Sequence, residues 1–429
     1  MRIAYITAGA AGMFCGSCMH DNTLVSALVG AGHDALLIPT YTPLRTDEID
    51  VSQKRVFFGG INVYLQEKFA LFRHTPWLLD RLLDARRLLS WVSRFAVNTK
   101  YGDLGDLTVS ILQGEQGHQR KEVAKLVGWL KDEIKPEVVN LTNVLLSGMV
   151  HELKRELGVP VLGTLQGDDI FLDALPEPYR GRALALIRDH CREMDGFIAT
   201  SGYYADFMAT YLGIPRERIH VVYPGLNLRG HGGPRQESNG APFTVGYFAR
   251  ICPEKGLHVL AEAFRLMQQE PGAPPARLRA SGWLGENNRP YLDEVRRALA
   301  GAGLGDRFVY VESPDHASKV RFLQGLDVLS VPTTYREPKG LYVLEALANG
   351  VPVVQPRHGS FPELVEATGG GLLVNPDDPR DLAAALRRLA DDAGHRTELG
   401  RKGQEAVRRR FHAAVMAEET VTVYRKYVA

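Results

Sequence analysis

Short runs of apolar residues alternate with longer segments whose apolar positions recur at helical spacing. The chain begins with such a run at 2–7, followed by a glycine-containing loop, a helix from about 20 to 32 and a second apolar run at 35–39. Strands that are apolar on both sides are typical of parallel sheets, because crossover helices cover both faces. The pattern predicts a Rossmann-like beginning. The same alternation resumes at residue 121 and predicts helices at 121–134, 147–157, 179–194 and 203–212, with strands at 138–141, 161–165, 196–200 and 220–223.

A second alternation begins with a strand at 243–248 and continues to about residue 392. The residues that separate the two alternations are polar and rich in glycine, so we interpret them as a linker. A chain of 429 residues exceeds one ordinary core, which favours two domains. Helical spacing at 396–427 is long enough to return to the first domain. The predicted divisions are a first domain at 1–225, a linker at 226–241, a second domain at 242–410 and a C-terminal helix at 411–429 that packs on the first domain.

Residues 41–120 do not fit a simple alternation and are expected to be an insertion in the first domain. A hairpin is predicted at 57–64, and leucines and arginines recur at helical spacing in 77–95. Such a helix can lie on a membrane surface or form a wall beside an acceptor. The favoured interpretation is a helical insertion that packs its leucines inward and leaves its arginines in water.

Composition excludes several classes of protein. With 51 basic and 50 acidic residues the formal net charge is +1, which gives no electrostatic basis for a nucleic-acid partner. No run of 18 apolar residues exists, and the first strand is too short for a signal peptide. A cytoplasmic protein is therefore expected, with peripheral contact at the inner membrane face as an option.

Four cysteines in this length do not form a disulfide framework. Cys15 and Cys18 have the spacing of a redox pair or of half a metal site, but Cys191 and Cys252 are single. Structural zinc is not favoured. Ordinary thiols are the favoured interpretation of all four.

The segment 327–354 carries the most functional information. It reads as strand, loop, helix and strand, with Glu337 in the loop, Gly340 opening the helix and Glu345 within it. Free amides at the start of a helix bind anions, so a phosphate is expected at Gly340, Leu341 and Tyr342. The carboxylate of Glu345 can accept hydrogen bonds from vicinal hydroxyls such as those of a ribose. Taken alone, the pair is better interpreted as a solvated loop charge at Glu337 and an ordinary exposed helix residue at Glu345, but the flanking motifs reverse this preference.

Two cationic side chains follow the strand at 243–248. Arg250 offers a planar fork and Lys255 a point charge, both between the end of a strand and the start of a helix. A diphosphate would fit there. Exposed arginines and lysines are common, however, so this motif alone leaves a purely structural role open.

Together these motifs resemble the retaining GT-B glycosyltransferases of the family 4 class. The resemblance covers nearly the whole chain and includes Arg250 with Lys255-Gly256, Ser281-Gly282, the segment from Glu337 to Glu345, the run 358–363, and Gly371 to Val374 with Asp377-Asp378-Pro379. It implies an α/β fold of two Rossmann-like domains that face each other across a cleft, with a C-terminal helix crossing back. It also implies a hexosyl- or glycosyltransferase of the EC 2.4 class, with no metal and no cofactor besides a nucleoside-diphosphate sugar as co-substrate.

The resemblance assigns roles by position. Arg250 and Lys255 would bind the donor diphosphate, Gly340 and Leu341 would donate backbone amides to it, and Glu345 would hold the ribose. Glu337 would lie beside the transferred sugar, where positive charge develops at the anomeric carbon. Gly12, in the first loop, is assigned to the donor. Attack on the front face would retain the configuration without a protein nucleophile, and the cations would stabilise the departing diphosphate.

The chain departs from the family pattern in three places. Gln166 stands where a histidine is usual after the strand at 161–165, and Lys339 replaces the usual aromatic residue before Gly340. The usual paired glycines of the first loop are spread among Gly12, Gly16 and the residues between them. Gln166 cannot act as a charged acid or base, although it can hydrogen-bond a sugar hydroxyl and is kept as a candidate catalytic residue. The acceptor, a carbohydrate, lipid or small molecule, is expected in the first domain. Its candidate contacts are His20, Asp21, Asp168 and Asp169.

Four other functions are weighed. In a glycosidase the two carboxyl groups stand about 5 to 9.5 Å apart, whereas eight helical residues span about 12 Å, so the pair fits an extended donor better. A nucleotide-sugar epimerase of the same fold is the nearest rival. A sugar-nucleotide-binding protein that has lost transfer is suggested by Gln166. A thiol-redox protein has only Cys15 and Cys18 in its favour.

Overall fold

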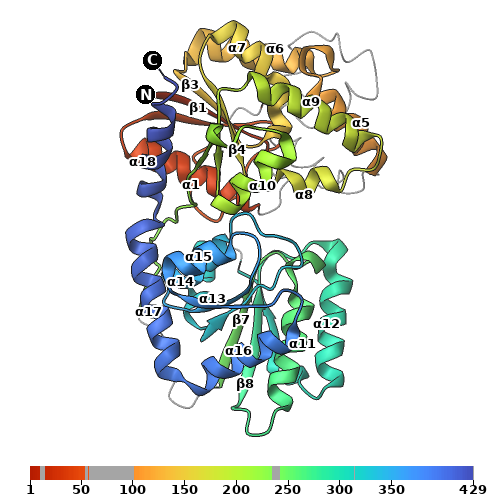
Figure 1. The fold of residues 1–429 in the computed structure, drawn as a ribbon, viewed down its shortest axis with the longest axis vertical. Helices are drawn as coiled ribbons and strands as arrows, with labels where there is room; N and C mark the ends of the chain where they lie inside the picture. The colour runs from red at the N-terminus through yellow and green to blue at the C-terminus, as the bar shows by residue number, and fades with distance from the viewer. Residues whose placement is uncertain (10–14, 54–56, 58–100, 234–241, 314, 429) are drawn as a thin grey trace. The chain divides into compact units, whose positions relative to one another are not determined.

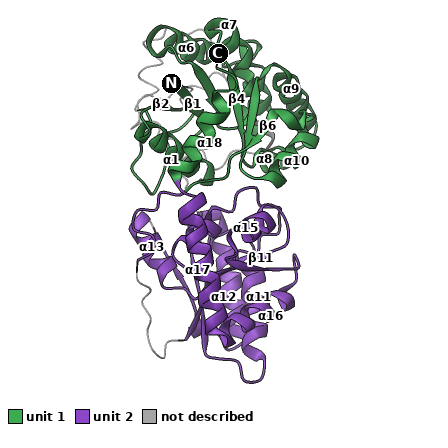
Figure 2. Ribbon diagram, turned by 60° about the vertical axis from the view of Figure 1, so that its left-hand side comes forward, with its two compact units in different colours: residues 1–225, 413–429 green, residues 226–412 purple. Residues whose placement is uncertain are grey.

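The computed structural model describes residues 1–9, 15–53, 57, 101–233, 242–313 and 315–428. The chain divides into two compact units, drawn in different colours in Figure 2. Unit 1 contains Met1–Gly225 and Ala413–Ala429, and unit 2 contains Leu226–His412. The boundary therefore falls at the start of the predicted linker, and residues 226–233 belong to unit 2.

Unit 1 is built on a parallel six-stranded sheet (Figure 1). Its strands follow the order β2-β1-β3-β4-β5-β6, so the direction of progression reverses between β1 and β3. In such a sheet ligands bind outside the carboxyl ends of the strands at the reversal. The strands are β1 Arg2–Thr7, β2 Asp34–Pro39, β3 Val138–Leu141, β4 Val161–Leu165, β5 Gly196–Ala199 and β6 Ile219–Val221.

Helices cover both faces of this sheet because side chains alternate along each strand. On β1, Ala4 and Ile6 belong to one hydrophobic core, and Ile3 and Tyr5 belong to the other. The first core is completed by α6, α7, α9 and α10, and the second by α1 and α18. The α-helices are α1 Gly16–Gly30, α5 Tyr101–Leu112, α6 Arg120–Trp129, α7 Val150–Leu157, α8 Asp168–Asp173, α9 Tyr179–Glu193, α10 Gly202–Leu212 and α18 Ala413–Tyr424.

The C-terminal part of the chain returns to unit 1. The stretch predicted as one helix is divided into α17, Ala393–Arg410, and α18, because Phe411 leaves the helical conformation with φ −115° and ψ 37°. Phe411 is buried and its carbonyl accepts a hydrogen bond from the Leu226 amide. The prediction of an uninterrupted helix was wrong, since the break depends on this packing and not on a glycine or proline. After the break, α18 packs beside α1.

Unit 2 contains a second parallel six-stranded sheet, in the order β12-β11-β10-β7-β8-β9. Here the progression reverses between β7 and β10. The strands are β7 Phe243–Phe248, β8 Ala276–Ser281, β9 Phe308–Val311, β10 Val328–Leu329, β11 Val353–Pro356 and β12 Gly371–Val374. The helices are α11 Leu257–Gln269, α12 Arg289–Gly301, α13 His316–Gln324, α14 Leu341–Ala348, α15 Phe361–Thr368, α16 Pro379–Asp391 and α17.

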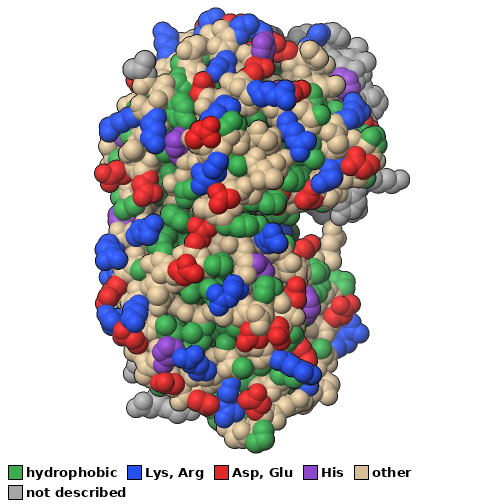
Figure 3. Space-filling view, viewed as in Figure 1, with side chains coloured by type: hydrophobic (Ala, Val, Ile, Leu, Met, Phe, Trp, Pro, Cys, Tyr) green, Lys and Arg blue, Asp and Glu red, His purple; other side chains and the backbone are tan. Residues whose placement is uncertain are grey.

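The predicted α/β class with two parallel sheets is confirmed. The hairpin and amphipathic helix predicted within 57–95 lie outside the described residues except for Phe57, which pairs with Thr40. None of the described helices is both long and apolar enough to cross a membrane. On the face drawn in Figure 3, basic and acidic side chains are interspersed.

None of the four cysteines, all of which lie in the described part of the chain, forms a disulfide. Cys18 is buried, and Cys15 is half-buried at the start of α1. Across the described ranges, no cluster of three or more histidine, cysteine, aspartate or glutamate side chains is arranged to hold a metal ion.

Candidate functional site

The reversal point of unit 2 brings together the motifs that were predicted to bind the donor. Arg250 and Lys255 follow β7, and the loop with Glu337 and Gly340 follows β10, the neighbouring strand. Because the two strands are parallel, their carboxyl ends open onto the same edge of the sheet. Arg250 is exposed there, and Leu341 is the first residue of α14.

Glu337 is the centre of this group of side chains and is only 4% exposed. Its Oε2 lies 2.6 Å from Nζ of Lys255 and accepts hydrogen bonds from the hydroxyls of Tyr335 at 2.7 Å and Tyr342 at 3.1 Å. Its Oε1 is 3.4 Å from the backbone nitrogens of Lys339 and Gly340. A buried carboxylate with this many donors is held in one orientation.

The same contacts set the charge of the site. Burial raises the pKa of Glu337, but the charge and hydrogen bond of Lys255, the hydroxyl of Tyr335 and the charge of Lys339 lower it to about 2. Glu337 is therefore a carboxylate at neutral pH. Burial, followed by the charge of Glu337, raises the pKa of Tyr335 and of Tyr342 well above the ordinary value, so both hydroxyls stay protonated and donate.

Lys255 lies between two aromatic rings. Its Nζ is 4.8 Å from the ring centroid of Tyr335 and 5.4 Å from that of Tyr342, and it also bonds the Tyr335 hydroxyl. Both distances lie within the range of a cation–π interaction. The ammonium group is thus held beside Glu337 by charge and by the rings.

Glycines let the neighbouring loops approach Glu337. Gly340 has φ +65° at the start of α14, and Gly359, in the loop after β11, has φ +59°. A Cβ on Gly359 would collide with the backbone of Glu337, whose carbonyl accepts a hydrogen bond from the Ser360 amide at 2.8 Å. The loop after β11 contains residues 358–363, which are part of the family resemblance. This loop thus supports the backbone of Glu337.

Glu345, one turn into α14, forms a buried ion pair. Its Oε1 lies 2.7 Å from Nζ of Lys319, which reaches it from α13, and the two side chains are 6% and 5% exposed. The carboxylate predicted to bind ribose is therefore oriented by a lysine that the sequence analysis did not identify.

Replacing Lys319 with methionine is expected to lower the free energy of unfolding by about 3 to 5 kcal/mol, because the charge of Glu345 would remain buried without this partner. Urea unfolding followed by circular dichroism measures the change. Lys402→Met is the matched control: Lys402 is half exposed and pairs with Glu398 on the surface of α17, so a change of about 0.5 kcal/mol or less is expected. Equal effects of the two substitutions would contradict the structural importance of the buried pair.

Lys255 and Glu337, which the sequence analysis assigned to the diphosphate and to the sugar, are in direct contact. The Gly340 amide, predicted to face an anion, already makes a long contact with Glu337. Gly12 lies outside the described residues.

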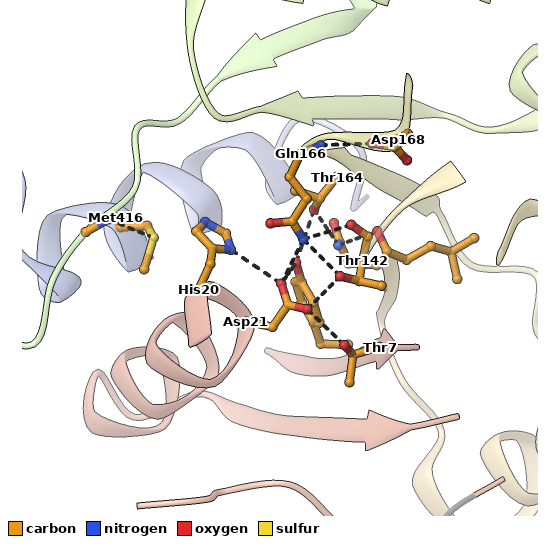
Figure 4. Close-up of polar contacts among 12 residues, drawn as sticks. Thr7, His20, Asp21, Thr142, Thr164, Gln166, Asp168 and Met416 are labelled. Atoms are coloured by element: carbon orange, nitrogen blue, oxygen red, sulfur yellow. Dashed lines mark hydrogen bonds and ion pairs between the residues drawn. The ribbon is translucent and has the colours of Figure 1, made fainter. Parts of the chain in front are cut away.

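Unit 1 contains a second polar cluster at the carboxyl ends of β1, β3 and β4 (Figure 4). Asp21, on α1, is fully buried and is its centre. Its Oδ1 accepts from the Tyr5 hydroxyl at 2.9 Å and from Nε2 of Gln166 at 3.1 Å. Its Oδ2 accepts from the hydroxyls of Thr7 at 2.9 Å and Thr142 at 2.6 Å.

Asp21 also contacts its neighbour in sequence, His20, whose Nδ1 is 3.3 Å from Oδ1. Burial raises the pKa of Asp21, but the hydrogen bond and charge of His20, together with the hydrogen bonds of Thr142 and Gln166, lower it overall. The centre of the cluster is therefore a carboxylate.

Gln166 has a structural role in this cluster. Its Nε2 faces Asp21 and is also 2.9 Å from both the carbonyl oxygen and the hydroxyl of Thr142. The side-chain amide nitrogen is thereby engaged inside the protein. Gln166, which stands where the family usually has a histidine, helps to orient the carboxylate of Asp21 by this hydrogen bond.

The two carboxylates after β4 hold the local loop. Asp168 is buried and accepts from the backbone amides of Val144 at 2.7 Å and Gln166 at 3.0 Å. Burial raises the pKa of Asp168 to about 6, against the lowering effect of these amides. Asp169 accepts from the Tyr204 hydroxyl at 2.5 Å. Of the four acceptor-side candidates, the structure joins only His20 and Asp21 directly.

Several residues of both clusters were not found from the sequence. Tyr335 and Tyr342 lie beside or within the segment from Glu337 to Glu345. Their position in the sequence could therefore have indicated that their hydroxyls contact Glu337. Lys319 carries no such signal, because it lies on a different element from Glu345. The same holds for the residues whose hydroxyls donate to Asp21, which are Tyr5, Thr7 and Thr142.

The fold with two parallel six-stranded sheets is similar to that of known structures. Sucrose-phosphate synthase from Thermosynechococcus elongatus superposes with a TM-score of 0.72 at 19% identity over 99% of this chain and 98% of the other. Anabaena HepE in complex with UDP superposes with a TM-score of 0.70 at 18% identity over 99% and 100%. The chain has the GT-B fold.

The sequence also matches models of two glycosyltransferase families, in agreement with the fold. Residues 109–229 match the family described as Glycosyltransferase Family 4, and residues 234–406 match Glycosyl transferases group 1. Both matches are to glycosyltransferase families, and together they cover most of the chain.

Individual curated relatives match over part of the chain. The D-inositol 3-phosphate glycosyltransferase of Corynebacterium efficiens is 30% identical over 53% of this chain and 55% of its own length. The α-maltose-1-phosphate synthase of Mycolicibacterium smegmatis is 32% identical over 55% of this chain and 64% of its own. The chain thus matches roughly half of the length of such curated relatives.

Proposed function

We propose that this protein transfers a sugar from a nucleoside-diphosphate sugar to an acceptor hydroxyl with retention of configuration. The buried carboxylate of Glu337, in contact with Lys255 at the reversal point of unit 2, is the observation that carries the proposal. Ligands of parallel sheets bind where the strand order reverses. The start of a helix and neighbouring cations at that point favour a phosphorylated ligand. HepE, of the same fold, has been crystallised with UDP and with UDP-glucose.

The proposed step needs charge stabilisation on both sides of the bond that breaks. The bond between the anomeric carbon and the diphosphate oxygen opens, and the acceptor oxygen bonds to the same face of that carbon while its proton leaves. Arg250 and Lys255 stabilise the negative diphosphate, with the amides of Gly340 and Leu341 as further donors. The carboxylate of Glu337 stabilises positive charge on the sugar.

The contacts of Glu337 are compatible with this binding mode. The contacts from the amides of Lys339 and Gly340 to Glu337 are long, at 3.4 Å, so an anion would exchange weak hydrogen bonds for stronger ones. Lys339, which is buried in the same loop, adds a third positive charge near the proposed diphosphate. Glu345, oriented by Lys319, would receive the ribose hydroxyls.

Thermal denaturation with UDP, GDP, ADP and their glucose conjugates tests donor binding. A ligand at 100 times its Kd stabilises the folded protein by about 2.7 kcal/mol, which corresponds to a rise of several degrees in Tm. We expect one base to give such a shift in the wild type and a reduced shift in Lys255→Met. If no nucleotide changes Tm, the donor-site proposal is wrong.

Transfer is tested with the donor that binds. Lys255→Ala and Glu337→Ala should both lose transfer or slow donor hydrolysis relative to the wild type. Equal rates in all three proteins would overturn the assignment of Lys255 and Glu337 to catalysis. Epimerisation of the donor in the absence of an acceptor would instead favour the epimerase.

A further inference from the structure

Two thiols lie at the start of α1, and the proposed transfer uses neither of them. Cys15 directly precedes the helix, and its carbonyl accepts the first helical hydrogen bond, from the Met19 amide at 3.0 Å. Cys18 follows three positions later, and residues with this spacing on a helix have Cβ atoms about 5 to 6 Å apart. Cys18 is a member of one hydrophobic core of unit 1, and Cys15 packs against the same core. The two side chains therefore lie on the same side of the helix.

The two thiols differ in their exposure to solvent. Cys15 is half-buried, whereas Cys18 is only 2% exposed. A reagent in solution therefore reaches Cys15 first. An accessible thiol beside a shielded one is typical of a dithiol that forms a disulfide in two steps, because the first thiol attacks the reagent and the second displaces it.

The start of the helix favours the reactive form of Cys15. The free amides at a helix N-terminus carry positive partial charge, which stabilises a thiolate placed there. None of the residues in the first turn of α1 is acidic, so no carboxylate of this turn opposes the effect. The other two cysteines have a different environment, since burial raises the pKa of Cys191 to about 12 and also raises the pKa of Cys252.

We propose that Cys15 and Cys18 form a reversible disulfide with a small-molecule disulfide, such as glutathione disulfide, as the oxidant. The Cys15 thiolate attacks one sulfur of the oxidant, and one glutathione leaves. The Cys18 thiolate then attacks the sulfur of Cys15, and the second glutathione leaves. The two cysteines lose two electrons, which reduce one disulfide to two thiols, and their two protons pass through water to the departing glutathiones. The site does not depend on the proposed function.

Closing this disulfide moves the start of α1. The Cβ atoms of a disulfide are about 3.8 Å apart, so the two residues approach each other by about 1 to 2 Å. Cys18 is held in the core, whereas Cys15 lies outside the helix with extended backbone angles, φ −122° and ψ 129°. The movement therefore falls on Cys15 and the first turn of α1, which leads into the polar cluster around Asp21.

Alkylation in glutathione redox buffers tests the proposal. The folded full-length protein is equilibrated in mixtures of glutathione and glutathione disulfide, quenched with acid, unfolded, alkylated and analysed by mass spectrometry. In oxidising mixtures Cys15 and Cys18 should both lose alkylation, and the peptide that contains them should become lighter by two hydrogen atoms. Cys191 and Cys252 should remain alkylated, and dithiothreitol should restore the first pair. Alkylation of both Cys15 and Cys18 in every mixture would overturn the proposal.

Serine variants separate the roles of the two thiols. Cys18→Ser should stop at a mixed disulfide between Cys15 and glutathione, whereas Cys15→Ser should leave Cys18 unmodified because it is buried. Serine is favoured at the position before a helix, so Cys15→Ser preserves α1. Cys191→Ser is the matched control and should form the disulfide as the wild type does. A mixed disulfide on Cys15 that persists in the wild type would overturn the role of Cys18.

Hydrogen exchange of the reduced and oxidised wild type measures the structural effect. Amide protection should change at residues 16–21 and stay constant in β7 and β8 of unit 2. A disulfide that forms without any change at 16–21 would overturn the proposed movement of the helix start.

Discussion

Glu337→Gln is expected to lower transfer about 100- to 1000-fold while leaving the side chain nearly the same size, since it removes a charge held beside the proposed anomeric carbon. Initial rates with saturating donor and acceptor measure the loss. Glu398→Gln is the control: Arg401 lowers the pKa of Glu398 to about 2 as well, but this carboxylate is on the surface of α17. Its replacement should leave transfer unchanged.

The same substitution has a predictable effect on stability. The pKa of Glu337 is about 2 in the folded protein and near 4.5 when the chain is unfolded, a difference worth about 3 kcal/mol at neutral pH. Because the folded pKa is the lower one, this contribution is present above pH 4.5 and is lost as the pH falls towards 2. The difference in unfolding free energy between wild type and Glu337→Gln should therefore shrink from pH 6 to pH 3. A difference that does not depend on pH would show that the carboxylate is not stabilised by its neighbours.

Substitution of Lys255 tests the ion pair between Lys255 and Glu337 directly. Lys255→Met alone leaves Glu337 buried beside two tyrosines, whereas the double variant with Glu337→Gln leaves no unpaired charge. The double variant is thus expected to be more stable than the sum of the single effects predicts. Additive effects would mean that the 2.6 Å contact contributes little.

The backbone of the donor site could be predicted from sequence because it depends on local patterns. The run at 243–248 was predicted as a strand, and β7 has these bounds. Gly340 and Leu341 mark the start of α14 through a conformation that favours glycine. Once strands and helices alternate, a parallel sheet places the ends of its strands on one edge. The positions of Arg250, Lys255 and Glu337 in loops at that edge follow.

The partners of these side chains could not be predicted in the same way. Lys319 meets Glu345 only because α13 packs beside α14, and its sequence neighbours Val320, Phe322 and Leu323 are ordinary core residues. Gln166 is 145 residues from Asp21, and its side chain was expected to face a substrate. Spacing along the chain fixes secondary structure, but the direction of a polar side chain depends on tertiary packing.

Asp21→Ala is expected to destabilise unit 1 by about 3 to 5 kcal/mol. An unpaired buried donor costs about 1 to 3 kcal/mol, but the donors around Asp21 are affected unequally. The Tyr5 hydroxyl keeps Thr164 at 3.2 Å, and Gln166 keeps both acceptors on Thr142. The hydroxyls of Thr7 and Thr142 and the ring of His20 lose the only side-chain acceptor that the described residues provide. The total is therefore smaller than five separate losses.

Because the chain has two compact units, a single unfolding curve could hide this effect. Hydrogen exchange of the full-length protein resolves it, since the amides of β1 and β3 report on unit 1 and those of β7 and β8 on unit 2. Protection should fall in the first set and stay constant in the second. Asp34→Ala, at the exposed start of β2, removes a carboxylate from the same sheet and should change neither. Equal protection of β1 in Asp21→Ala and wild type would mean that the carboxylate is not needed to hold the ends of these strands together.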